Sequence, residues 1–183
     1  MTISRTLGFG ALLLLASIGI SSCLSPPDYP DTPEISFKNI QKTRVDTITG
    51  LFDRVVVTVS FKDGDGDLGL DNGDTSPPYN ELDPITQLPN RYYNNYFFQP
   101  QIQNGSGQFE DYNLSFSYNA RYPRLSPTNQ GDRKEPLKGD LNFKQQFFQG
   151  TFPRNSVVRF KVKIVDRALH ESNEITTEPV TFE

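Results

Sequence analysis

Apolar side chains at every second position constrain the fold of this chain more than any other feature of its sequence. Val55, Val57, Val59 and Phe61 alternate with Thr58 and Ser60, and the same pattern recurs at Val158, Phe160, Val162 and Ile164. Successive side chains of a strand point to opposite faces, so this period predicts strands with one face on a core and one in water. We therefore expect antiparallel sheets.

Weaker alternation predicts further strands along the chain. They cover residues 35–37, 96–103, 114–118, 137–143 and 175–182. Asn104–Gly107 is typical of a hairpin turn, and Pro179 predicts a bulge or an edge strand. No segment after Cys23 has a helical period. About seven strands without a strand–helix–strand rhythm predict an all-β fold, with a single antiparallel β-sandwich over residues 34–183.

The last part of the chain also resembles a known kind of domain. Residues 157–182 look like the closing two strands of an immunoglobulin- or fibronectin-like domain, and Asp166–Asn173 would be the loop between them. That loop is similar to the D-x-A-G-N-x-S turn of bacterial Ig-like modules, with Leu169-His170 in place of Gly-Asn. The resemblance implies an Ig-like sandwich, to which this chain adds two long loops, 70–92 and 120–136. Loops of such length are functional or disordered in compact domains.

The start of the chain predicts export. Arg5 precedes an apolar run from Leu7 to Ile20, and the small residues Ser21 and Ser22 lead to the single cysteine, Cys23. This order is typical of a secretory signal peptide, here residues 1–22, and the run is shorter than the roughly 20 residues that a membrane span needs. Residues 24–33 hold four prolines, which predict an extended linker between Cys23 and the domain.

Ile20-Ser21-Ser22-Cys23 resembles the relaxed lipobox of Bacteroidetes lipoproteins. That resemblance implies cleavage before Cys23, acylation of its sulfur, and a stable lipid anchor in the bacterial envelope, at the outer membrane. The leaflet stays open. The alternatives are a free thiol after an ordinary signal peptide, or a cytoplasmic protein with an apolar start. An unpaired cysteine in an oxidising compartment would be reactive, which favours acylation.

The most suggestive chemistry follows the strand that ends near Phe61. Asp63, Asp65 and Asp67 alternate with glycines, and Asp71 follows four residues later. Such spacing lets the backbone curl until carboxylate oxygens converge, and Ca²⁺ binds six to eight oxygens at about 2.3–2.6 Å. A true EF-hand is not expected, because Leu68 stands where its glycine belongs, Asp74 replaces its last Glu, and strands flank the loop.

The predicted topology adds one more carboxylate. If residues 55–61 form the second strand and residues 158–164 the sixth, the loops that follow them lie at the same end of an Ig-like sandwich. Asp166 would then face Asp63–Asp67 and complete a calcium site. Three interpretations remain: a structural Ca²⁺ site, a turn whose carboxylates only cap backbone N–H groups, and a directly functional metal. Arg167 argues against a metal, because it could neutralise the carboxylates by ion pairing instead.

Other residues carry less chemistry. The only histidine, His170, is expected in an exposed loop, and with Cys23 committed to lipid the chain lacks the groups for a nucleophilic triad or a His-based zinc site. The formal charge of −4 argues against nucleic acid as a partner. Asp46-Thr47-Ile48 resembles the O-glycosylation motif of secreted Bacteroidetes proteins, which would place a glycan on Thr47.

The sequence therefore predicts a lipid-anchored envelope module without catalytic activity, and the whole pattern resembles a group of uncharacterised Bacteroidetes lipoproteins. We expect it to contact a protein or glycan partner through loops or a sheet edge, because a sandwich holds its loops on a rigid scaffold. The alternatives are a structural accessory subunit of an outer-membrane complex and a carboxylate-based hydrolase.

Overall fold

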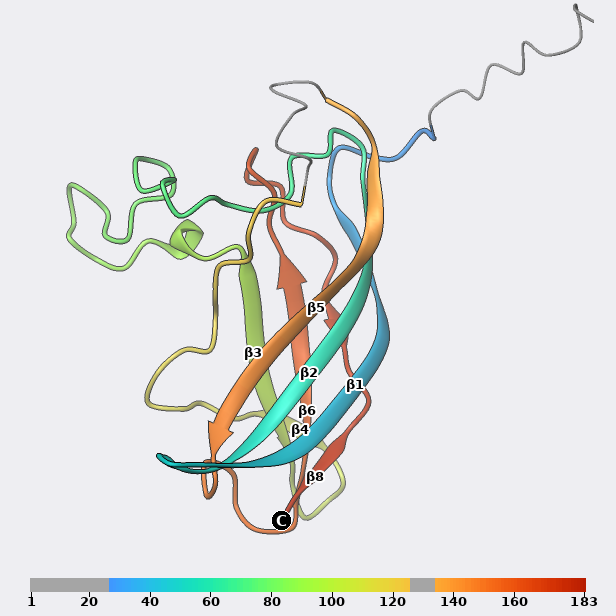
Figure 1. The fold of residues 1–183 in the computed structure, drawn as a ribbon, viewed down its shortest axis with the longest axis vertical. Helices are drawn as coiled ribbons and strands as arrows, with labels where there is room; N and C mark the ends of the chain where they lie inside the picture. Colours follow the sequence, from blue (N-terminus) through green and yellow to red (C-terminus); the bar gives the residue numbers. More distant parts are fainter. Residues whose placement is uncertain (1–26, 126–133) are drawn as a thin grey trace, which may run out of the picture.

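The computed structural model describes residues 27–125 and 134–183, and two antiparallel β-sheets pack face to face within them (Figure 1). Eight strands and one 3₁₀ turn occur in these residues, and α-helix is absent from them. The chain is thus all-β, as predicted. The predicted signal peptide (residues 1–22) and Cys23 lie outside the described residues.

The first sheet contains three long strands in the order β1-β2-β5. They are β1 (Glu34–Thr47), β2 (Gly50–Asp63) and β5 (Leu137–Phe148). A two-residue turn joins β1 to β2, whose register runs from Thr47 opposite Gly50 to Glu34 opposite Lys62. This tight hairpin places the beginning of β1 and the end of β2 side by side at one end of the sandwich.

The second sheet has the order β4-β3-β6-β7, with β8 also paired to β6. Its strands are β3 (Tyr96–Gln103), β4 (Phe109–Asp111), β6 (Ser156–Ile164), β7 (Ile175–Thr176) and β8 (Val180–Phe182). The 3₁₀ turn η1 (Arg91–Tyr93) precedes β3. The strand order β1-β2-β5 corresponds to strands A-B-E of an immunoglobulin-type sandwich, and the order β4-β3-β6-β7 corresponds to its strands C′-C-F-G.

The core lies between the sheets and follows the predicted alternation. Val55, Val57 and Val59 of β2 are fully buried, as are Val158 and Phe160 of β6. Aromatic rings fill the rest: Tyr96 stacks on Phe143 with ring centroids 3.9 Å apart, and Phe98 stacks on Phe160 at 4.6 Å. Each fully buried side chain of this size contributes about 1.5–3 kcal/mol.

Two strand predictions need correction. Residues 114–118 form no strand; the chain pairs with β3 earlier, through β4, across the turn that closes with Gly107 N–H donating to Asn104. Further along the same edge of β3, the side-chain carbonyl of Asn119 accepts from the Phe98 amide. This bond takes the place of a backbone bond that a strand at 114–118 would have made. The predicted strand 175–182 is split into β7 and β8 around Pro179, which lacks an N–H to donate.

Candidate metal centre

The site begins on the inner face of β2. Val55 to Phe61 fill this face at every second position, and the next inward position holds Asp63, the last residue of the strand. Asp63 is fully buried and pairs in register with Leu137 of β5. A carboxylate therefore stands where the strand period calls for an apolar side chain, and such a group needs a compensating charge.

Three more carboxylates converge on this position. Asp63, Asp65, Asp67 and Asp166 each offer an oxygen within 4.8 Å of the others. Asp65 and Asp166 are also buried, and Asp67 is half-buried. The four side chains come from the end of β2, the loop after it and the loop after β6, which the predicted topology places at the same end of the sandwich. This group, which we call the aspartate cluster, could hold a metal ion.

Backbone contacts fix the loop that carries three of these residues. Leu68 forms a β-bridge with Asp166, and its carbonyl accepts from the Leu125 amide at 3.1 Å. Gly66 has a φ of 67° and lies so close to the chain that a Cβ there would stand 2.1 Å from the Glu135 carbonyl oxygen. Only glycine fits that position, so the Asp-Gly alternation is a requirement of packing as well as of flexibility.

The oxygens of the aspartate cluster differ in their hydrogen bonds. Both oxygens of Asp63 and Oδ1 of Asp65 are buried without a hydrogen-bond partner. By contrast, Asp67 accepts from the Arg167 backbone N–H at 3.2 Å. Asp166 accepts from the backbone N–H of His170 at 2.7 Å and lies 2.8 Å from its Nδ1. The three unpartnered oxygens could therefore accept a cation, because buried polar atoms are nearly always bonded.

The electrostatics of the aspartate cluster are unfavourable without such a partner. Burial, followed by the charges of Asp65, Asp67 and Asp166, raises the pKa of Asp63 to about 7. Burial and the charges of Asp166 and Asp65 raise the pKa of Asp67 to about 6. Burial also raises the pKa of Asp166, against the opposing effect of its bonds with His170. Near neutral pH the cluster is therefore poised to exchange protons for a cation.

Two side chains supply part of the compensating charge. The Lys134 ammonium lies 3.0 Å from Oδ2 of Asp65, although its side chain is 72% exposed. His170 contacts Asp166, and this bond raises the pKa of the imidazole. With both groups protonated and all four carboxylates ionised, the six groups carry a net charge of −2, which is the charge that one divalent cation neutralises.

The structure places the other predicted residues as follows. Asp71 is exposed and lies outside the aspartate cluster; its carbonyl accepts from Arg121 at 3.0 Å. The Arg167 guanidinium pairs with Asp74 and lowers the pKa of that carboxyl. Arg167 therefore neutralises Asp74 with its side chain and touches the cluster only through its backbone N–H. Thr47 ends β1, and its hydroxyl donates to the Gly50 carbonyl at 2.9 Å.

Two groups at the site were missed by the sequence reasoning. Lys134 is 69 residues from Asp65, and no local pattern links them. The Tyr122 hydroxyl is buried without a partner, and its pKa is raised well above the usual value by burial and then by Asp63, Asp166 and Asp67. A third contact of the site, between His170 and Asp166, does have a signal in the sequence. His170 follows Asp166 by four residues, and this spacing suits a turn in which the carboxylate bonds the histidine.

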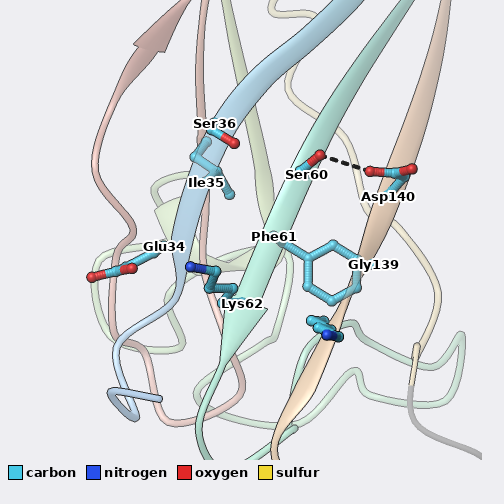
Figure 2. A pocket seen from close by; sticks show the side chains of 9 residues that line it. Glu34, Ile35, Ser36, Ser60, Phe61, Lys62, Gly139 and Asp140 are labelled. Atoms are coloured by element: carbon cyan, nitrogen blue, oxygen red, sulfur yellow. Dashed lines mark hydrogen bonds between the residues drawn. The ribbon is translucent and has the colours of Figure 1, made fainter. Parts of the chain in front are cut away.

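A separate hollow of about 440 Å³ lies along β1, β2 and β5 (Figure 2). Phe61 forms part of its lining beside Gly139, and a Cβ on that glycine would stand 3.2 Å from the Phe61 ring. Glu34 and Asp140 are its acidic residues, and Asp140 is already paired: it accepts from Ser60 at 2.7 Å and forms an ion pair with Lys38. Asp140 therefore differs from Asp63 of the aspartate cluster, whose two buried carboxylate oxygens have no hydrogen-bond partner.

No protein-family model, curated protein or solved structure matches this chain. Within the described residues, no helix has the length and apolar character to cross a membrane.

Proposed function

We propose that this protein is a binding module of the bacterial cell envelope, whose Ig-like sandwich is held together at one end by a Ca²⁺ ion. The observation that carries the proposal is Asp63: a fully buried carboxylate with no hydrogen-bond partner, surrounded by three further carboxylates. Burying an ionised carboxylate is costly unless a cation compensates it.

Ca²⁺ fits the chemistry of the aspartate cluster. Its ligands are oxygens at about 2.3–2.6 Å, so two oxygens on one ion lie at most about 5.2 Å apart. The four oxygens of the cluster meet this limit, since all lie within 4.8 Å of one another. Carboxylates alone do not suit zinc or copper, which prefer nitrogen and sulfur ligands.

The ion would act on the structure of the loops. The aspartate cluster joins the loop after β2 to the loop after β6, and the β-bridge between Leu68 and Asp166 pairs the two loops side by side. A cation bound between them replaces repulsion by attraction and stabilises the native state by an amount that rises with the logarithm of its concentration above the Kd. This supports a structural metal rather than a catalytic one.

The opposite end of the sandwich supports contact with a protein partner. Ile48, at the tip of the β1–β2 hairpin, is fully exposed, and Phe148, at the end of β5, is 60% exposed. Phe148 packs against Phe52 with ring centroids 4.4 Å apart, and Leu51 adds further exposed apolar surface. Exposed apolar groups that gather in one place mark interaction surfaces in soluble domains. Lipid attachment through Cys23 would hold the end with the aspartate cluster near the membrane. The end with Ile48 and Phe148 would then point away from the membrane.

The metal part of the proposal is tested by thermal unfolding of the purified protein, first in EDTA and then with Ca²⁺ added in steps. We expect the midpoint to rise with Ca²⁺ concentration, and Asp65→Ala to abolish the rise. An unchanged midpoint, or an equal rise in Asp65→Ala, contradicts the site. For the partner, cross-linking on intact cells should recover an envelope protein through wild type and much less through Phe148→Ser.

A further inference from the structure

The segment that leads into β1 is packed directly onto the aspartate cluster. The Gly64 amide, between Asp63 and Asp65, donates to the Pro30 carbonyl at 2.8 Å. A Cβ on Gly64 would stand 2.2 Å from the Tyr29 carbonyl oxygen and 2.8 Å from that of Pro30. The backbone of the incoming chain therefore occupies the space that any other residue at position 64 would fill.

Side chains extend this contact on both sides. The Lys62 ammonium lies over the Tyr29 ring, 5.8 Å from its centroid, and Pro33 is buried. The charge of Asp31 acts on Lys134, which is the cation bound to Asp65. Asn173, in the loop after β6, then holds the start of β1 by two hydrogen bonds of 2.8 Å with Ile35. Residues 29–33, which belong to the predicted linker, thus lie against the loop after β2, and the loop after β6 holds the beginning of β1 that follows them.

We infer that the aspartate cluster is a cation-dependent latch for this segment. With a divalent cation bound, Asp63 and Asp65 are drawn together, Gly64 keeps its position, and residues 29–33 stay docked. Without the cation, repulsion between ionised carboxylates displaces the loop and releases the segment. This inference rests on the proposed metal site and adds a regulatory role to it.

The consequence is a change of reach. Five released residues add about 15 Å of extended chain at about 3.1 Å per residue. For a domain anchored at Cys23, the cation would set how far the sandwich stands from the membrane. Coupling of this kind is reciprocal, so docking of residues 29–33 also tightens cation binding, typically by about 5–150-fold.

Hydroxyl-radical footprinting of the full-length protein tests the latch, with oxidation of the Tyr29 ring as the readout. The protein is treated in cation-depleted buffer and again with Ca²⁺, and Ca²⁺ binding is followed in parallel by thermal unfolding. We expect Ca²⁺ to slow Tyr29 oxidation severalfold and to leave Phe148, at the opposite end, unchanged. Gly64→Ala should still be stabilised by Ca²⁺, with weaker affinity, but its Tyr29 should oxidise rapidly in both buffers.

Gly73→Ala is the matched control, because that glycine has no heavy atom near its Cβ position and should behave as wild type. Stabilisation by Ca²⁺ with equal Tyr29 oxidation in both buffers overturns the latch and leaves the metal site intact. Slow oxidation in Gly64→Ala with Ca²⁺ also overturns it. Failure of Ca²⁺ to stabilise the wild type overturns the metal site itself. If Gly64→Ala does not fold, the comparison of Tyr29 oxidation in wild type with and without Ca²⁺ still tests the latch.

Discussion

Replacing Asp63 by Asn should make the cation-free protein more stable and the cation-bound protein less so. In the folded state the Asp63 carboxyl keeps its proton up to about pH 7, whereas an unfolded chain releases it near 3.8. An acid shifted in this direction lowers the free energy of unfolding as the pH rises, by about 4 kcal/mol once the pH exceeds 7. Asn has almost the same shape without the charge, so it removes this penalty.

The assay is thermal unfolding at pH 8, in EDTA and in saturating Ca²⁺. In a domain of this size, 1 kcal/mol shifts the midpoint by about 2–4 °C, so the gain in EDTA has an upper bound of roughly 8–16 °C. Ca²⁺ reduces this advantage, because wild type gains about 2.7 kcal/mol at a concentration 100 times the Kd and about 4.1 kcal/mol at 1,000 times the Kd, whereas the variant gains none. Above about 1,000 times the Kd the order therefore reverses.

Asp53→Asn is the matched control. Asp53 is a buried carboxylate on the same face of β2, but it pairs with Lys42 at 3.4 Å and Arg44 at 3.6 Å. Its replacement should destabilise the protein equally in both buffers, since a buried pair loses one partner. If Asp63→Asn is destabilising in EDTA, Asp63 serves as a backbone cap. That result would contradict the prediction that its charge destabilises the cation-free protein.

Three further predictions follow from single features. The stability of the EDTA-treated wild type should fall as the pH rises from 4 to about 7, because Asp63 and Asp67 have raised pKa values, and saturating Ca²⁺ should abolish that fall; chemical denaturation at several pH values measures it. Tyr96→Phe should leave the melting midpoint unchanged or raise it, because the Tyr96 hydroxyl is buried without a partner; a large drop would show a bond that we do not see. Phe160→Ala should cost about 3–5 kcal/mol in urea unfolding, since the ring is fully buried in the core; a loss under 1 kcal/mol would contradict that packing.

The sandwich could be predicted because its strands repeat one simple pattern. The alternation from Val55 to Phe61 and from Val158 to Ile164 set the inner faces of β2 and β6, and these strands form the centre of each sheet. The error at 114–118 arose because alternation in a short segment does not show whether a partner edge is available. In the structure, β4 pairs only with residues 101–103 of β3, and further along this edge the Asn119 side chain accepts from the Phe98 amide in place of a strand.

The candidate site was predictable in part for the same reason. Strand order alone places the loops after β2 and β6 at one end, which brings Asp166 to Asp63, Asp65 and Asp67. Asp71 could not be excluded, because its spacing fits a loop ligand; the structure turns the chain away at Leu70, whose amide donates to the Tyr122 carbonyl. Lys134 and the packing of Tyr29 on Gly64 depend on contacts between distant segments, which no local pattern records.

Binding of one divalent cation by the aspartate cluster can be measured by calorimetric titration of the chelator-treated protein with Ca²⁺. We predict one ion per chain in wild type, affinity that rises with pH between 5 and about 8 as the raised pKa values of Asp63 and Asp67 are passed, and no binding in Asp63→Asn. Absence of binding in wild type, or equal binding in Asp63→Asn, would contradict the account.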